Sequence, residues 1–168
     1  MIHVKNIVLI GMPGAGKSTV GVLLAKSLLM DFTDTDLIIQ RETGCSLSET
    51  INTKGTQYFI ELEENIIMSG NYNESVIATG GSAVYGEKAM KSLKENGIAV
   101  YLKTDLDELI KRLGDITTRG IAMQKGSSIA ELFAERSPLY EKYADITVDC
   151  TDKTPEESVD EIIKKLGL

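Results

Sequence analysis

Short apolar runs alternate with longer segments of mixed polarity along the chain, and this order predicts a parallel sheet with crossover helices. Runs rich in apolar and β-branched residues predict five strands, at about 6–10, 31–34, 75–78, 98–102 and 146–149. The segments between them predict helices that begin or run at about 17–29, 37–43, 46 onward, 57–69, 87–95, 105–113, 127–143 and 154 onward. There is no internal repeat or linker. The pattern therefore predicts an α/β fold in three layers, with a five-stranded parallel sheet flanked by helices, in one domain over 1–168.

Two of the helix starts carry their own sequence signature. Ser46 and Thr154 are each followed three residues later by a glutamate, which is the spacing of a capping box. Pro155 follows Thr154 directly and fits the first helical position. These patterns fix where two of the helices begin.

The most informative stretch is GMPGAGKST at residues 11–19, which fits the phosphate-binding pattern G-x-x-x-x-G-K-[ST]. It lies between the first strand and the first helix, so its backbone N–H groups and the positive helix end can face a phosphate. In this pattern Lys17 reaches the β- and γ-phosphates and the Ser18 hydroxyl binds Mg²⁺. The alternative is a glycine-rich turn that binds nothing. The predicted nucleotide-binding residues are Gly11, Gly14, Ala15, Gly16, Lys17, Ser18 and Thr19.

Further polar or glycine residues follow the second and third strands. Of Asp34 and Asp36, one carboxylate can hold Mg²⁺ and the other can accept a proton from a substrate hydroxyl. Taken alone, this pair also fits a turn that caps the next helix. Gly80 and Gly81 can bring backbone N–H groups to an anion or form a tight turn. Since parallel strands end at one edge of their sheet, we expect these residues to meet the phosphate-binding loop there.

Arg112, Arg119 and Arg136 lie in the C-terminal half of the chain. Arg119 falls in an irregular segment, 114–125, and a loop arginine can close over ATP and stabilise charge on a transferred phosphoryl group. Each could instead be an ordinary surface arginine.

Composition narrows the class of partner. The net charge of −7 and the isoelectric point near 4.8 argue against nucleic acid. Cys45 and Cys150 are too few and too far apart in sequence for a disulfide framework or a zinc site. We expect no signal peptide and no membrane span ahead of the first strand. The lone histidine, His3, is given no catalytic role. We expect a cytoplasmic protein, monomeric, that acts on a small molecule without a membrane or nucleic-acid partner.

The order of motifs resembles the shikimate kinase family over nearly the whole chain. After the glycine-rich loop come FTDTD at 32–36, a strand that ends in two glycines, a loop arginine, and RSPLY at 136–140. The resemblance implies a P-loop kinase fold of the nucleoside-monophosphate-kinase type, with a substrate-binding region at about 35–65 and a lid at about 114–125. It also implies ATP- and Mg²⁺-dependent phosphorylation of the 3-hydroxyl of shikimate, a step toward chorismate and the aromatic amino acids.

The resemblance assigns roles to individual residues. The implied catalytic residues are Lys17, Asp36 and Arg119, with Asp36 as the candidate base. The implied metal ligands are Ser18 and Asp34. The implied substrate-binding residues are Asp36, Gly80, Gly81 and Arg136, of which Arg136 pairs with the substrate carboxylate. Arg112 and Arg119 join the nucleotide site, and residues 149–155 form part of the adenine pocket.

The chain departs from the family pattern on the substrate side. The family usually has G-E-x-x-F-R-x-x-E where this chain reads GTQYFIELE at 55–63, so Ile60 stands in place of an arginine that binds the substrate carboxylate. Glu63 is kept, and we expect its charge to be unpaired. Ser82 replaces a third glycine, and Gln40 replaces a glutamate. Gly120 follows Arg119 where the lid usually has a proline, which predicts a looser lid.

These departures leave two alternatives to shikimate phosphorylation. One is a kinase that acts on a different hydroxyl-bearing metabolite, because a carboxylate that loses one of two arginines loses a charge-assisted partner. The other is a catalytically weak homologue that binds ATP. A nucleoside monophosphate kinase is disfavoured, since the middle of the chain lacks a basic cluster for a second nucleotide.

Overall fold

The structure is a computed structural model that describes residues 5–114, 120–124 and 126–168. The strands in these ranges are β1 (Asn6–Ile10), β2 (Asp31–Asp34), β3 (Ser75–Ala78), β4 (Gly97–Lys103) and β5 (Ile146–Asp149). They form one parallel sheet in the order β2-β3-β1-β4-β5. The predicted five-stranded parallel sheet is confirmed, and each predicted strand lies within one residue of the observed one.

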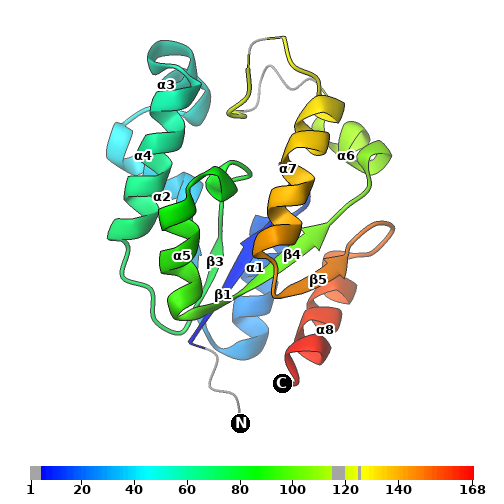
Figure 1. The fold of residues 1–168 in the computed structure, drawn as a ribbon. Helices are drawn as coiled ribbons and strands as arrows, with labels where there is room; N and C mark the ends of the chain where they lie inside the picture. Colours follow the sequence, from blue (N-terminus) through cyan, green and yellow to red (C-terminus); the bar gives the residue numbers. More distant parts are fainter. Residues whose placement is uncertain (1–4, 115–119, 125) are drawn as a thin grey trace.

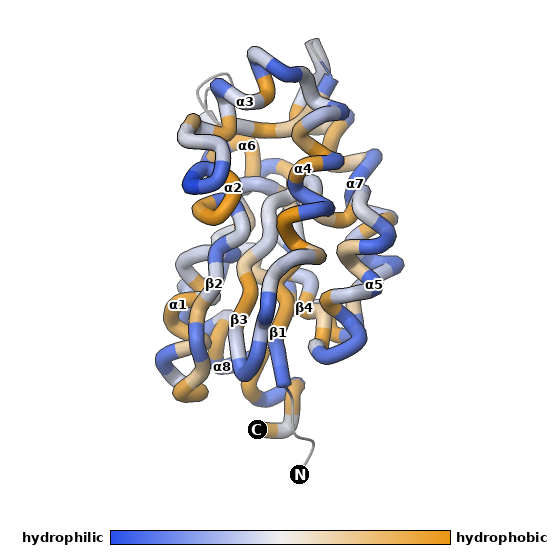
Figure 2. The backbone as a smooth tube through the Cα atoms, turned by 90° about the vertical axis from the view of Figure 1, so that its left-hand side faces the viewer, coloured by the Kyte–Doolittle hydropathy of each residue, from blue (hydrophilic) through white to orange (hydrophobic). Residues whose placement is uncertain are grey.

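The apolar runs become strands because the sheet is covered on both faces. Every residue of β1 and of β3 is buried, which suits strands that pair on both edges and pack on both sides. β1 lies at the centre, with Leu9 opposite Ala78 of β3 on one side and Val100 of β4 on the other. Hydrophobic residues accordingly concentrate on the central strands (Figure 2).

Helices cover the two faces of the sheet and complete three layers. On one face lie α1 (Lys17–Leu28) and α8 (Pro155–Leu166), and on the other lie α5 (Glu87–Glu95) and α7 (Ile129–Tyr143) (Figure 1). The remaining elements are α2 (Thr35–Thr43), α3 (Leu47–Lys54), α4 (Thr56–Ser69), the short η1 (Ala83–Tyr85) and α6 (Leu106–Leu113). None of the described helices is long and apolar enough to cross a membrane.

The predicted capping residues start their helices. Thr154 and Glu157 form a complete capping box at α8, with each side chain bound to the other residue's backbone N–H. At α3 the Ser46 hydroxyl accepts the N–H of Glu49. These caps satisfy backbone donors that a helix leaves open in its first turn.

A second, smaller hydrophobic cluster holds the substrate-side helices together. It joins Ile39 of α2 with Phe59 and Ile66 of α4, and it includes Ala122 from the segment 120–124. The hydroxyl of Thr56 also donates to the carbonyl of Met123 at 3.1 Å. This part of the predicted lid region therefore lies on α4, beyond the carboxyl ends of the strands (Figure 1).

Candidate active site

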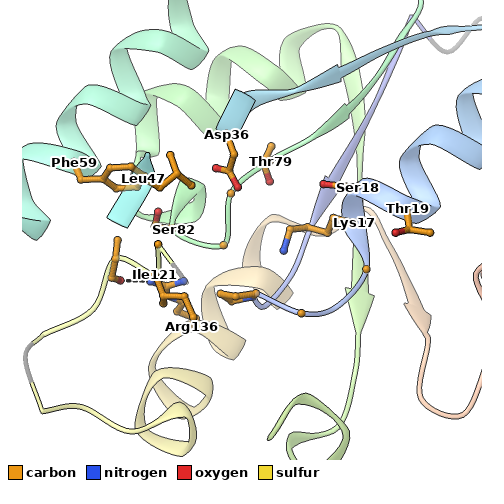
Figure 3. Close-up of a pocket in the computed structure, with 17 residues that line it drawn as sticks. Lys17, Ser18, Thr19, Asp36, Leu47, Phe59, Thr79, Ser82, Ile121 and Arg136 are labelled. Atoms are coloured by element: carbon orange, nitrogen blue, oxygen red, sulfur yellow. Dashed lines mark hydrogen bonds between the residues drawn. The ribbon is translucent and has the colours of Figure 1, made fainter. Parts of the chain in front are cut away.

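The loops that follow β1, β2 and β3 converge on one cavity of about 420 Å³. Lys17, Asp36 and Arg136 reach it from α1, α2 and α7 (Figure 3). Its lining contains the predicted site residues Gly14, Gly16, Lys17, Ser18, Thr19, Asp36, Gly80, Gly81 and Arg136. It also contains Pro13, Leu47, Phe59, Thr79, Ser82, Gly120, Ile121 and Ala122, of which Ser82 and Gly120 are departures from the family pattern. The convergence at the carboxyl edge of the sheet follows from the parallel topology.

The glycine-rich loop ends at the N-terminus of α1. Gly16 has a φ of 90° and precedes the helix without a side-chain cap, so the first N–H groups of α1 are open to an anion. Gly11 and Ala15 do not line the cavity: a Cβ on Gly11 would lie 2.7 Å from the carbonyl oxygen of Leu102, and Ala15 is buried. These two residues shape the loop from behind.

Lys17 is held inside the loop. Its Nζ donates to the carbonyl oxygens of Gly11 and Met12 at 2.6 and 2.8 Å. Burial lowers the pKa of this amine to about 8, against the attraction of Asp36, which raises it. A triphosphate would draw Lys17 from these carbonyls, because a phosphate oxygen is a charged acceptor and a carbonyl is not.

Asp34 both caps α2 and faces Ser18. Its Oδ1 accepts the N–H groups of Asp36 and Leu37 at 2.9 and 3.4 Å, and its Oδ2 accepts the Ser18 hydroxyl at 2.8 Å. The capping and metal interpretations of this residue are thus compatible. A hydroxyl and a carboxylate suit Mg²⁺, which takes oxygen ligands and keeps several waters. Within the described ranges there is no cluster of three or more His, Cys, Asp or Glu side chains that could hold a metal ion by itself.

Asp36 lies in the first turn of α2 and points into the cavity (Figure 3). Burial, and to a smaller extent the nearby Asp34, raises the pKa of its carboxyl to about 6, against the attraction of Lys17, which lowers it. The group is therefore mostly ionised at pH 7 and can accept a proton from a hydroxyl, since a general base works best with a pKa near the working pH.

The two glycines after β3 allow close approach of three charged side chains. A Cβ on Gly80 would lie 2.4 Å from Glu63 Oε2 and 2.8 Å from Asp36 Oδ1, and one on Gly81 would lie 2.9 Å from Arg136 Nη1. A side chain at either position would displace these groups. The N–H of Gly80 donates to Thr35 Oγ1 at 3.3 Å, so this donor is engaged within the protein.

Arg136 is 1% exposed, although it belongs to the cavity wall. Its Nε donates to the Tyr85 hydroxyl at 3.2 Å, its guanidinium lies over the Tyr85 ring, and its Nη2 donates to the carbonyl of Ala122. Tyr140, one helical turn further, donates its hydroxyl to the carbonyl of Gly81 at 2.6 Å. The sequence contains no pattern that marks Tyr85, because it is 51 residues from Arg136.

The other predicted nucleotide-binding residues lie outside this cavity. Arg112 pairs with Glu108 at 2.9 Å and donates to the carbonyl of Gly14 at 3.1 Å, which places it beside the glycine-rich loop. Arg112 belongs to α6, and the 149–155 segment contacts the start of that helix, since Thr151 Oγ1 accepts the N–H of its N-cap residue, Asp105, at 3.0 Å. Arg119 lies outside the described residues. Two elements expected at the adenine pocket are therefore adjacent.

The departures from the family pattern fall in different places. Ile60 does not line the cavity; it lines a neighbouring space of about 380 Å³ that also contacts Tyr85 and Ala122. The Oε1 atom of Glu63 accepts the Ser82 hydroxyl at 2.5 Å, so this carboxyl has a neutral hydrogen-bond partner, and its Oε2 has none among the described residues. Gly120 packs against α3, where a Cβ would lie 2.4 Å from Leu47 Cβ.

A glycine-rich loop at a helix N-terminus, a lysine in that loop, and a serine–aspartate pair at the next strand define the class of P-loop kinases. A sequence model of the shikimate kinase family matches residues 13–167. The chain belongs to the shikimate kinase family.

Individual relatives agree with the family match. A shikimate kinase of Thermodesulfovibrio yellowstonii is 40% identical over 96% of this chain and 94% of the relative. The structure of the Acinetobacter baumannii shikimate kinase in complex with shikimate is 29% identical, with a TM-score of 0.88 over 98% of this chain and 93% of that one. The Aquifex aeolicus enzyme is 36% identical, with a TM-score of 0.81 over 96% of both chains. The chain is therefore a phosphotransferase with an alcohol group as acceptor, and ATP is its phosphate donor.

Proposed function

We propose that this protein transfers the γ-phosphoryl group of ATP to the 3-hydroxyl of shikimate. The observation that carries the proposal is that Lys17, Asp36 and Arg136 line one cavity, so a phosphate site, a base and a carboxylate site adjoin. The solved relative with shikimate bound supports the choice of acceptor. In this proposal residues 1–168 form one domain, with a substrate-binding region at about 35–65 and a lid at about 114–125. The protein acts as a monomer in the cytoplasm.

On the donor side, backbone N–H groups of the glycine-rich loop and the start of α1 bind the phosphates, and Lys17 supplies a positive charge beside them. Ser18 and Asp34 would hold Mg²⁺. When bound, MgATP supplies the phosphoryl group, with the metal neutralising charge on the phosphate oxygens. Arg112 lies beside the loop on this side, and Arg119 completes the proposed donor site from the lid.

On the acceptor side, Asp36 holds the reacting hydroxyl and accepts its proton. Arg136 pairs with the substrate carboxylate, a contact for which its guanidinium must share or exchange the bond to the carbonyl of Ala122. Gly80 and Gly81 leave room for these two side chains, because a Cβ on Gly80 would crowd Asp36 and one on Gly81 would crowd Arg136. Hydroxyl and carboxylate are thus recognised at two separate points, which orients the substrate.

A second candidate function is phosphorylation of a different hydroxyl-bearing metabolite. Arg136 is the single arginine that lines the cavity within the described part of the chain, and Ile60 contributes no charge nearby. One guanidinium binds a carboxylate less tightly than two. An acceptor without a carboxylate would make no use of Arg136, which favours shikimate between the two.

The deciding experiment is ADP release with MgATP and shikimate, taken to high millimolar shikimate. We expect turnover with a KM within the range common for enzymes, about 1 μM to 1 mM. A parallel panel of cyclitols and hydroxy acids tests the second candidate. ATP binding without turnover on any acceptor would contradict both and indicate a catalytically weak homologue.

A further inference from the structure

Within the described ranges, three charged side chains are buried: Lys17, Glu63 and Arg136. Lys17 and Arg136 have roles in the proposed function, but Glu63 has none. It is 1% exposed, belongs to α4, and its carboxyl group adjoins Gly80 and Ser82 of the same cavity. Charged side chains are rarely buried without a partner of opposite charge. The burial of this carboxyl group therefore requires an explanation.

Glu63 lies directly behind the wall of the cavity. Ser82 lines the cavity and donates its hydroxyl to Glu63 Oε1 at 2.5 Å. Oε2 has no hydrogen-bond partner among the described residues, and it lies 2.4 Å from the point that a Cβ of Gly80 would occupy. The missing side chain of Gly80 thus leaves room for this oxygen. Glu63 does not itself line the cavity, so its charge is the property that can reach the cavity's contents.

The charged groups around Glu63 come from three elements. Asp36 on α2 faces it with a negative charge, and Arg136 on α7 and Lys17 on α1 face it with positive charges. Burial, helped by Asp36, raises the pKa of Glu63 to about 7, while the Ser82 hydrogen bond and the two cations act in the opposite direction. Both protonation states are therefore populated near neutral pH.

A carboxylate bound beside Arg136 would lie close to Glu63, because Arg136 Nη1 and Glu63 Oε2 adjoin the consecutive glycines 81 and 80. We propose that Glu63, held by Ser82, is a specificity-determining residue of the acceptor site, which admits an acceptor carboxylate beside Arg136 when it is uncharged and repels it when it is ionised. This inference rests on the proposed function. It makes Glu63 a positioning residue that sets the charge of the site without touching the substrate.

The test is the pH dependence of the KM for shikimate. A carboxylic acid is ionised throughout pH 6–8.5, so changes in this range come from the protein. For the unaltered protein we expect KM to rise by about tenfold from pH 6 to 8.5. This is the effect expected if ionised Glu63 and the substrate carboxylate repel each other by the equivalent of one pKa unit. Glu63→Gln keeps an oxygen that can accept the Ser82 hydroxyl but carries no charge. In this variant we expect the tenfold rise of the KM for shikimate to disappear.

Two further variants separate charge from structure. Ser82→Ala removes a bond that stabilises the ionised form, so we expect the rise in KM to occur at higher pH. Glu61→Gln removes an exposed carboxylate from the same helix and should keep the unaltered profile. ADP is measured directly by chromatography, so that no coupling enzyme limits the pH range, and circular dichroism checks that each variant folds. The KM for ATP serves as an internal control.

The outcomes distinguish this inference from the proposed function. Turnover of shikimate with the same KM profile in the unaltered protein and in Glu63→Gln would overturn the inference and leave the proposed function standing. Calorimetry in two buffers of different ionisation enthalpy gives a readout independent of turnover. We expect proton uptake when shikimate binds at pH 7.5, and loss of that uptake in Glu63→Gln. Failure of the unaltered protein to bind or phosphorylate shikimate would overturn both.

Discussion

Replacement of Glu63 by glutamine is expected to change how the free energy of unfolding depends on pH. Burial raises the pKa of Glu63 from 4.5 to about 7 in the folded state. Between these values the folded protein therefore binds more protons than the unfolded chain at this group. The stability that comes from this protonation is fully present below about pH 4.5 and is lost as the pH rises through about 7.

The magnitude follows from the size of the shift. One pKa unit corresponds to about 1.4 kcal/mol, so a rise from 4.5 to about 7 gives a loss of about 3 kcal/mol across this interval. Glutamine does not titrate and removes that trend. We therefore expect Glu63→Gln to gain stability relative to the unaltered protein by up to about 3 kcal/mol between pH 4.5 and pH 8.

Urea unfolding at several values between pH 4.5 and pH 8, followed by circular dichroism, measures this difference. Taking the difference between variant and parent at each pH cancels the titration of the groups that do not interact with Glu63. Glu61→Gln on the exposed face of α4 is the matched control and should show a flat difference. A difference for Glu63→Gln that stays constant within about 0.5 kcal/mol, the usual scatter of additive effects, would refute the reasoning that Glu63 is buried with a raised pKa.

Three other substitutions test the site. Lys17→Ala should abolish measurable turnover, because it removes the one lysine that lines the cavity among the described residues. A thermal unfolding midpoint close to that of the parent would show that the fold is retained, and an active variant would contradict the proposed phosphate site. Ile60→Arg should lower the KM for shikimate by about tenfold or more, the value of a charge-assisted hydrogen bond, and an unchanged KM in steady-state assays would mean that position 60 does not reach the acceptor. Gly120→Ala should raise the KM for shikimate with little change in the KM for ATP, since a Cβ would lie 2.4 Å from Leu47 and push residues 120–122 away from α3. Equal changes in the two KM values would contradict a role of this contact in the acceptor site.

The sequence was sufficient for the sheet and for one side of the site. Strands and helices were predictable because apolar periodicity differs between them and because the central strands β1 and β3 are buried along their whole length. The convergence of Lys17, Asp36 and Gly80 was predictable too, since parallel strands end at one edge. Each of these conclusions depends on local pattern or on topology, both of which a single sequence carries.

Contacts between side chains on different elements were not predictable in the same way. Tyr85 lies under the guanidinium of Arg136, and Ser82 donates to Glu63, yet nothing in the spacing of these residues marks either pair. Ile60 occupies a neighbouring space and not the acceptor cavity. Such details depend on how far apart elements pack and on which rotamers that packing allows, and period-based patterns do not encode either.

The two departures at Ile60 and Ser82 act on the same carboxyl group, and this links their consequences. Residues 60 and 63 are three apart on α4, so their side chains are neighbours on the helix surface. Isoleucine at 60 offers Glu63 no positive charge, and the hydroxyl of Ser82 is the partner that the structure provides instead. An arginine at position 60 would favour the ionised form of Glu63 and lower its pKa. Ile60→Arg is therefore expected to add a ligand for the substrate carboxylate and, in the same variant, to weaken the rise of KM with pH, because a charged Glu63 would then be paired at every pH tested.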